Sequence, residues 1–176
     1  MRILLILLLS VCMSGTLIAK EKTMFKTKNK IPNRLIDYKG FQKTVNSSSE
    51  EREAKRLTEE EFLKMIETEN VILLDARSES RYKLRHIQGA ISLPFTEFTK
   101  ESLAEAIPNL NSKILIYCNN NFTGSPQAFA AKAPAASLNL STFVSLKAYG
   151  YTNIYELGPL LDIKTTKLPF EGTEVE

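Results

Sequence analysis

Cys118 is the residue in this sequence with the clearest capacity for chemistry. It ends an apolar run at 114–117 and precedes a polar segment: Asn119, Asn120, Asn121, Phe122, Thr123 and Gly124. Asn and Gly readily adopt turn and left-handed backbone angles, so consecutive amide N–H groups can converge on one point. Around sulfur, such donors would favour a thiolate or a persulfide. The pattern predicts a reactive sulfur held by main-chain donors; the alternatives are a plain polar loop and a buried structural cysteine.

Composition leaves few other chemistries. The 176 residues include one histidine, His86, and two cysteines, Cys12 and Cys118, so we expect neither a metal site nor a cofactor. Hydrophobic residues make up 43% and charged residues 24%, which is typical of a soluble globular protein. A net charge of +3 without a basic stripe predicts no nucleic-acid partner.

Residues 1–19 have the order of a secretory signal peptide. Arg2 precedes an apolar run at 3–13, and small residues then lead to Ala19, after which we place cleavage. The run is shorter than the roughly 20 residues that a bilayer-spanning helix needs, so we expect no stable membrane span. A lipoprotein attached at Cys12 and an uncleaved anchor are the alternatives. The sequence therefore predicts export to the periplasm or the extracellular space, with Cys118 as the one thiol of the mature chain.

The rest of the chain divides into a basic leader with a docking arm at 20–56, a domain at 57–170 and a tail at 171–176. Within the first part, 35–45 is an apolar arm and 46–49 a linker. Helical patterns cover 58–69, 96–107 and 141–149, and apolar runs typical of buried strands cover 71–74, 91–93, 114–117 and 153–157. This alternation predicts an α/β fold, a parallel β-sheet with helices on both faces. Because ligands bind beyond the carboxyl ends of such strands, Cys118 should stand at the functional edge.

Several segments carry a resemblance to a known family. They are Leu-Leu-Asp-Ala-Arg at 73–77, Arg-His-Ile-Gln-Gly-Ala-Ile-Ser-Leu-Pro at 85–94, the strand that leads into Cys118, and Gly-Tyr-Thr-Asn-Ile-Tyr-Glu-Leu-Gly at 150–158. Together with the helix start at 57–62, they resemble the rhodanese-like sulfurtransferase family. Arg85 stands where that family usually has Gly.

The resemblance implies that Cys118 accepts sulfane sulfur as a persulfide and passes it to a nucleophile. It implies substrate binding by Arg81 and by the loop after the cysteine: Asn119, Asn120, Asn121, Phe122 and Thr123. A solvent-facing helix arginine is the alternative for Arg81. Asp75 and Arg77 would brace the sheet edge, and His86 would pack in a turn.

The partners implied are a small sulfur-containing anion or a thiol acceptor, and an envelope protein. Two other functions stay open. One is a non-catalytic rhodanese-like module that binds a partner or a small anion. The other is a thiol-redox or trafficking factor that uses Cys118 in mixed disulfides.

The loop departs from the family pattern. Thr123 stands where many members have Arg, Asn121 where many have Gly, and Asn120 where members that use thiosulfate have a basic residue. Gly124 occupies the Arg position of the Cys-x5-Arg pattern, which disfavours phosphatase chemistry.

An insertion at 125–140 separates the loop from the next helix. We expect it to fold over the Cys118 loop and to change access to the sulfur, with Lys132 supplying the positive charge that the loop lacks. A surface excursion without a role is the alternative.

Overall fold

The computed structural model describes residues 31–175, so the expected signal peptide and most of the basic leader lie outside the described residues. Residues 31–37 belong to a separate unit, in which the Leu35 amide donates to Asn33 Oδ1 at 2.9 Å. The second unit begins at Tyr38 and contains every helix and strand described below. Within 31–175, no helix is both long and apolar enough to cross a membrane.

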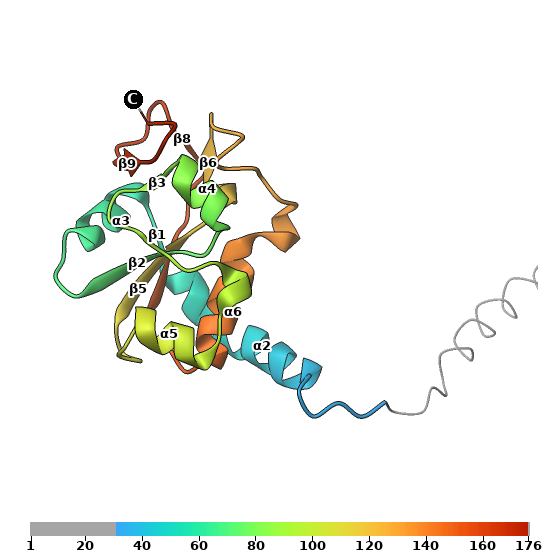
Figure 1. Cartoon of the computed structure of the whole chain (residues 1–176). Coiled ribbons are helices and arrows are strands. Elements are labelled where there is room, and N and C mark those ends of the chain that lie inside the picture. The colour runs from blue at the N-terminus through green and yellow to red at the C-terminus, as the bar shows by residue number, and fades with distance from the viewer. Residues whose placement is uncertain (1–30, 176) are drawn as a thin grey trace, which may run out of the picture. The chain divides into compact units, whose positions relative to one another are not determined.

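A five-stranded sheet forms the centre of this unit, and each of its neighbouring strands pairs in parallel (Figure 1). Its order is β1 (Arg56–Leu57), β7 (Ile154–Leu157), β5 (Lys113–Tyr117), β2 (Val71–Asp75) and β4 (Ile91–Ser92). Asp75 pairs with Tyr117 in register, so β2 and β5 end side by side at the carboxyl edge. The predicted parallel sheet is confirmed.

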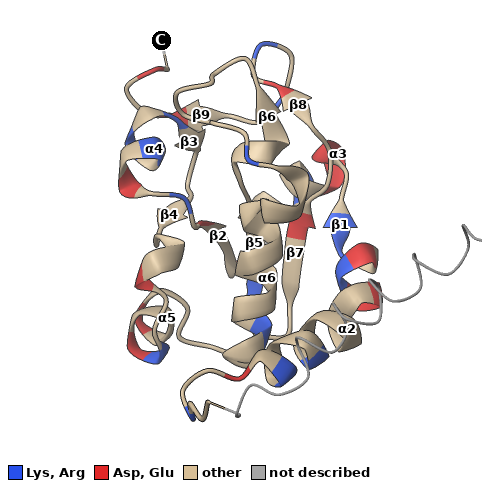
Figure 2. Cartoon of the chain, turned by 90° about the vertical axis from the view of Figure 1, so that its right-hand side faces the viewer, with Lys and Arg blue, Asp and Glu red and all other residues tan. Residues whose placement is uncertain are grey.

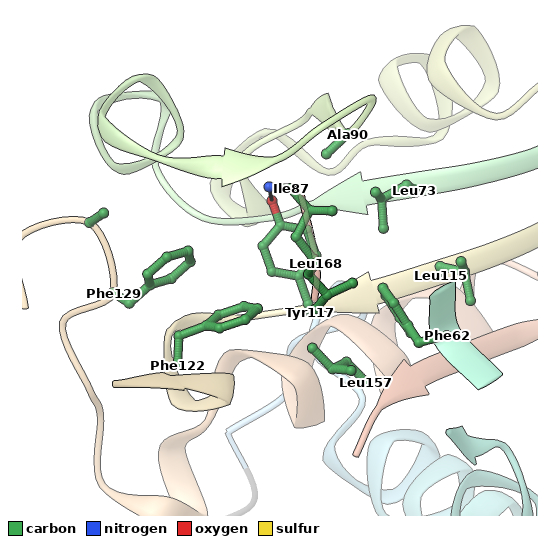
Figure 3. Packing of buried hydrophobic residues seen from close by; sticks show 11 residues of the cluster. Phe62, Leu73, Ile87, Ala90, Leu115, Tyr117, Phe122, Phe129, Leu157 and Leu168 are labelled. Carbon is green, nitrogen blue, oxygen red and sulfur yellow. Dashed lines mark hydrogen bonds between the residues drawn. The ribbon is translucent and has the colours of Figure 1, made fainter. Parts of the chain in front are cut away.

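Helices cover both faces of the sheet, as the alternation predicted. On one face, Phe62 of α3 (Glu59–Ile66) packs with Leu73 and Leu115 in a buried cluster (Figure 3). On the other face, the buried cluster contains side chains of α5 (Lys100–Ala106), α6 (Leu138–Ala148) and the alternate strand positions: Leu103, Phe143, Leu146, Leu74, Ile114 and Ile116. Successive strand side chains point to opposite faces, so each short apolar strand contributes to both clusters.

Helix starts follow their capping residues. The helix predicted from 58 starts with a capping box at Thr58, where the Glu61 amide donates to Thr58 Oγ1 at 3.3 Å. The helix predicted from 96 begins instead at Lys100, because a separate 3-10 turn, η1 (Phe95–Glu97), precedes it. Thr99 and Ser102 then form a second capping box.

The insertion after the Cys118 loop is shorter than predicted. Helix α6 begins at Leu138, three residues before the expected N-cap Ser141, so the insertion ends at Ser137. It includes the 3-10 turn η3 (Pro134–Ala136). Gly150 follows the helix with φ of +97°, the left-handed angle expected of its C-terminal glycine.

The linker predicted at 46–49 is wrong, because a single helix, α2 (Tyr38–Ala54), runs through it. Ser48 Oγ donates to the Thr44 carbonyl at 2.6 Å, and Ser49 Oγ donates to the Asn46 carbonyl at 3.1 Å. The hydroxyl groups of these serines therefore find hydrogen-bond acceptors on the preceding turn of the helix. The polar composition of 46–49 had suggested a break in the helix at this point.

Helix α2 docks on the domain through charged groups. Glu51 pairs with Lys147 of α6 at 2.7 Å, and Arg52 pairs with Glu156 of β7 at 2.6 Å. Tyr38 and Phe41, two of the apolar residues expected to make this contact, are exposed. Figure 2 shows α2 beside β1 and β7, with the acidic segment of β7 next to the basic segment of β1.

Acid should weaken the docking of α2. Hydrogen bonds from Lys147 and Lys55 lower the pKa of Glu51 below its ordinary value of 4.5. The stabilisation is therefore complete above pH 4.5 and is lost as the pH falls through the folded-state pKa. Glu51→Gln should lower the free energy of unfolding in urea by about 0.2–1 kcal/mol at pH 7 and by less at pH 3. Glu105→Gln, an exposed carboxylate of α5, is the control, and a Glu51→Gln effect of equal size at both pH values would contradict this assignment.

The segment predicted as a tail belongs to the domain. Strand β9 (Phe170–Glu171) pairs antiparallel with β3 (His86–Ile87), and the Glu174 amide donates to the Leu84 carbonyl at 2.8 Å. Another small pair, β6 (Phe122–Thr123) with β8 (Leu161–Asp162), follows the cysteine loop. The domain boundary at 170 is therefore wrong.

Candidate active site

Cys118 directly follows β5 at the carboxyl edge of the sheet, where the sequence predicted it. Its side chain is only 1% exposed, and its surroundings are polar. Sγ lies 3.5 Å from Ser137 Oγ of the insertion and 3.4 Å from the Asn120 amide nitrogen. A sulfur in this position has hydrogen-bonding neighbours, so Cys118 is not an apolar core residue.

The loop does not form the predicted cup of several main-chain donors. Residues Asn119–Asn121 make one 3-10 turn, η2. In that turn, the Asn121 amide donates to the Cys118 carbonyl at 3.1 Å and the Phe122 amide donates to the Asn119 carbonyl. These two amides are used within the backbone, and the Asn120 amide is the one main-chain donor recorded at the sulfur among the described residues. The prediction of a converging nest is wrong.

Asn121 fixes the shape of this turn. Its Oδ1 accepts from the Cys118 amide at 2.9 Å and from Asn139 Nδ2 at 3.1 Å. Its Nδ2 donates to the carbonyls of Leu157 at 2.7 Å and Pro159 at 3.2 Å. A buried amide with all these partners is a positioning group for the cysteine backbone. The sequence predicted Asn121 as a substrate contact. In the structure its side chain instead holds the backbone of the Cys118 loop in place.

Asn119 and Asn120 hold the insertion against the loop. Asn119 Nδ2 donates to the Ala130 carbonyl. Asn120 Nδ2 donates to the Lys132 carbonyl at 2.8 Å, and the Lys132 amide donates back to Asn120 Oδ1 at 3.1 Å. The expectation that the insertion folds over the loop is confirmed by these bonds and by the contact of Ser137 with the sulfur.

A cavity of about 330 Å³ opens beside the sulfur, and we call it the sulfur cavity. It is lined by Arg52, Arg56, Cys118, Asn120, Asn121, Pro134, Ser137, Asn139, Leu140, Glu156 and Gly158. The two arginines supply the cationic charge that the loop itself lacks.

The sequence analysis missed Arg52, Arg56 and Glu156. Arg56 and Glu156 are register partners in β1 and β7, and their side chains approach to 4.0 Å between Nε and Oε1. Arg52 lies in α2, Arg56 in β1 and Glu156 in β7, so only the folded chain brings the three residues together. No local spacing in the sequence would have found them.

Arg81 lies at a different cavity, of about 460 Å³, which we call the Arg81 cavity. Asn119 and Lys132 line it as well, whereas Cys118 does not. The predicted substrate residues therefore divide between two cavities on the two sides of the loop. The charge that Lys132 was expected to bring to the sulfur comes from Arg52 and Arg56 instead.

Phe122 and Thr123 are not placed to contact a substrate at the sulfur. Phe122 is 2% exposed, and its ring packs near Tyr117 and Phe129 (Figure 3). Phe170 contacts the same ring. Thr123 is exposed, and its hydroxyl donates to the Leu161 carbonyl at 3.4 Å. Neither residue lines the sulfur cavity, because both lie in β6, which pairs with β8.

The backbone at Gly124 does not suit the arginine that the Cys-x5-Arg pattern of phosphatases requires at this position. Its φ is +91°, and a Cβ atom there would lie 2.8 Å from Ile163 Cγ1. An arginine at this position would therefore meet both backbone strain and a steric clash.

Asp75 and Arg77 brace the sheet edge, as the resemblance implied. Arg77 Nε donates to Asp75 Oδ1 at 2.9 Å, and Arg77 Nη1 donates to the Ala128 carbonyl of the insertion at 2.8 Å. Burial alone would lower the pKa of Arg77, but the bonds to Asp75 and its charge outweigh burial and raise that pKa. Burial and the Asp75 charge raise the pKa of Tyr117 well above its ordinary value, so its phenol donates to Asp75 Oδ2 at 2.6 Å.

His86 lies in strand β3, not in the turn that the resemblance implied, and its side chain packs against Tyr82. Its ring stacks on Tyr82 with centroids 3.7 Å apart, and its Nδ1 lies 2.8 Å from the Tyr82 carbonyl oxygen. The side chain lines neither cavity described above.

The chain is similar to several known proteins. The chain is 33% identical over 95 residues to the thiosulfate sulfurtransferase PspE of Escherichia coli (strain K12), covering 54% of this chain and 76% of that protein. A solved structure of a rhodanese with anions from E. coli is 26% identical, with a TM-score of 0.39 over 58% of this chain and 98% of that one. The BH2092 protein from Bacillus halodurans is 19% identical, with a TM-score of 0.48 over 76% and 88% of the two chains.

The family model that matches this chain spans residues 58–158. That range begins at the Thr58 cap, includes the strands from β2 to β7 with Cys118, and ends at Gly158. Helix α2 lies before it. The parallel sheet, the cysteine at its carboxyl edge and this match together show that the chain belongs to the rhodanese-like domain family.

Proposed function

We propose that this protein is a sulfurtransferase that carries sulfane sulfur as a persulfide on Cys118. The observation that carries the proposal is the position of Cys118 Sγ, at the carboxyl edge of the sheet and beside a polar cavity lined by two arginines. The thiosulfate sulfurtransferase PspE, 33% identical over 95 residues, supports thiosulfate as the donor to test.

The reaction has two balanced steps. The Cys118 thiolate attacks the outer sulfur of thiosulfate, a new sulfur–sulfur bond forms at Sγ, and sulfite leaves with the electron pair of the broken bond. Cyanide or another nucleophile then takes the outer sulfur, and the electron pair returns to Sγ as thiolate. The cavity of about 330 Å³ gives the added sulfur room. The Asn120 amide and the Ser137 hydroxyl lie next to Sγ, which bears the negative charge when Cys118 is a thiolate.

Mass spectrometry tests the proposal directly. The full chain is incubated with thiosulfate and freed of excess, and we expect one added sulfur atom on the peptide that contains Cys118. Cyanide should remove that sulfur and yield one equivalent of thiocyanate. A protein that gains no sulfur, and that forms no thiocyanate in the presence of both reagents, would rule the proposal out.

The low exposure of Cys118 favours a second candidate, a non-catalytic binding module. A residue that is 1% exposed reacts only when the insertion around it opens. The rate of alkylation by iodoacetamide separates the two functions. A rate at or above that of a free thiol near neutral pH supports catalysis, and a rate lower by about a hundredfold supports the binding module.

We also propose export of the protein, based on the order of residues in 1–19. N-terminal sequencing of the protein recovered from cells that express the full chain should then begin at Lys20. Recovery of the chain with Met1 intact would contradict this proposal.

A further inference from the structure

The sulfur cavity is partly formed by residues from outside the segment that matches the family model. Arg52 comes from α2 and Arg56 from β1, both before residue 58. Glu156, which Arg52 contacts at 2.6 Å, lies within the matched range. The family domain and its preceding helix therefore build this cavity together.

Two buried acceptors of the cavity have no donor among residues 31–175. Glu156 Oε1 accepts from Arg52, but Oε2 has no partner in that range. Asn139 Nδ2 donates to Asn121, while Asn139 Oδ1 has none there either. The two side chains are 5% and 3% exposed, and both residues line the cavity. Buried acceptors in folded proteins are normally satisfied, so these two indicate a ligand that brings N–H donors.

One hydrogen-bond donor among the residues that line the cavity also lacks an acceptor within residues 31–175. Arg52 Nη2 is bonded to Glu156, but its buried Nε has no acceptor within the described part of the chain. A guanidinium with a free edge is suited to a carboxylate. Within the described chain, the residues that line the sulfur cavity thus hold two unused acceptors and one unused donor close together.

We infer that this cavity binds the sulfur acceptor and that the acceptor is a small aminothiol acid, a thiol bearing both an ammonium and a carboxylate group. This inference rests on the proposed persulfide. The ammonium would donate to Glu156 Oε2 and Asn139 Oδ1, and the carboxylate would accept from Arg52. A volume of about 330 Å³ suits a molecule of amino-acid size.

Charge balance supports a zwitterion. Arg52 pairs with Glu156 at 2.6 Å and Arg56 with Glu53 at 3.0 Å, so each arginine of the lining already has a carboxylate partner. A ligand without net charge keeps this balance, whereas a second anion would add repulsion at the sulfur.

Transfer to this acceptor needs no oxidant or reductant. The acceptor thiol loses its proton to solvent, and its thiolate attacks the outer sulfur of the Cys118 persulfide. A sulfur–sulfur bond forms on the acceptor, the bond to Cys118 Sγ breaks, and the electron pair remains on Sγ. The products are the acceptor persulfide and the Cys118 thiolate.

A series of three thiols tests the inference on the wild-type chain. Protein loaded with thiosulfate and freed of excess is mixed with L-cysteine, with 3-mercaptopropionate, which lacks the amine, or with cysteamine, which lacks the carboxylate. Loss of the Cys118 persulfide is followed by mass spectrometry of quenched samples. Each rate constant is divided by that of the same thiol with a small aromatic disulfide, which removes differences in intrinsic reactivity. We expect the normalised rate of L-cysteine to exceed each of the others by about tenfold or more.

Matched variants assign the recognition to individual side chains. Glu156→Gln should remove most of the advantage of L-cysteine over 3-mercaptopropionate, and Arg52→Gln most of its advantage over cysteamine. A purely structural role would slow all three thiols alike and leave these ratios unchanged. Glu60→Gln on α3, whose partner is the exposed Lys64, should keep both ratios.

The possible outcomes separate this inference from the proposed function. Equal normalised rates for the three wild-type reactions would overturn the inference, and the persulfide would still stand if cyanide releases thiocyanate. A chain that neither gains sulfur from thiosulfate nor passes it to cyanide overturns the proposed function, and the inference with it. The wild-type series remains decisive even if a variant fails to fold.

Discussion

Cys118→Ser should abolish the transfer of sulfur from thiosulfate to cyanide, with a fall of about a thousandfold or more in turnover. The hydroxyl of serine is scarcely ionised near neutral pH, so it cannot attack the outer sulfur of thiosulfate. The substitution exchanges one sulfur atom for a smaller oxygen atom and leaves the rest of the side chain unchanged. The fold should therefore survive, which the melting temperature and far-UV circular dichroism will check. Formation of thiocyanate measures the activity.

The loop also offers a control for this experiment. Thr123 lies five positions after the cysteine, but it is exposed and bonds to the Leu161 carbonyl at 3.4 Å. Thr123→Ala should retain the turnover of the wild type within about twofold, because the residue lies outside the sulfur cavity. Turnover by a well-folded Cys118→Ser protein would place the reactive group elsewhere.

Arg77→Met should produce the largest loss of stability, about 3–5 kcal/mol in the free energy of unfolding. The substitution leaves Asp75, which is 0% exposed, as a buried charge without its cation. It also removes the donors to the carbonyls of Ala128 and Arg85, each at 2.8 Å. Urea unfolding at neutral pH, followed by circular dichroism, measures the change.

Two further variants show whether the loss of stability in Arg77→Met comes from the unpaired buried charge. Lys64→Met breaks an exposed ion pair with Glu60 and should change the stability by no more than about 1 kcal/mol. Asp75→Leu combined with Arg77→Met should cost less than the sum of the single changes, because no unpaired charge then remains inside. An Arg77→Met protein within about 1 kcal/mol of the wild type would show that the pair does not brace the sheet edge.

Arg77 also links stability to the site. Its Nη1 bonds the Ala128 carbonyl, and Ala128 belongs to the insertion whose last residue, Ser137, lies against the sulfur. The buried ion pair therefore anchors one end of the segment that covers Cys118. Loosening it exposes the sulfur as well as weakening the sheet edge, so alkylation of Cys118 should accelerate in Arg77→Met.

The sequence alone determined the parallel sheet, the placement of helices on both of its faces and the position of Cys118 at the carboxyl edge. The reason is that these features follow from local patterns. Short apolar runs at 71–74 and 114–117 are typical of strands buried on both faces, and Thr58 with Glu61 caps a helix within one turn. The ordered segments of the resemblance identified the family for the same reason, since each is contiguous.

The surroundings of the sulfur were decided by the tertiary structure. The helix that carries Arg52 meets Glu156, which lies 104 positions away, and no local pattern encodes that contact. The asparagine amides turned toward the insertion and the backbone because those partners lay within reach once the chain had folded. Long-range packing also explains why Arg81 and Cys118 line different cavities. Residues of the loop and of the insertion line both cavities and separate the two side chains. Residue types along the chain predict which groups can react, whereas long-range packing decides which of them share a cavity.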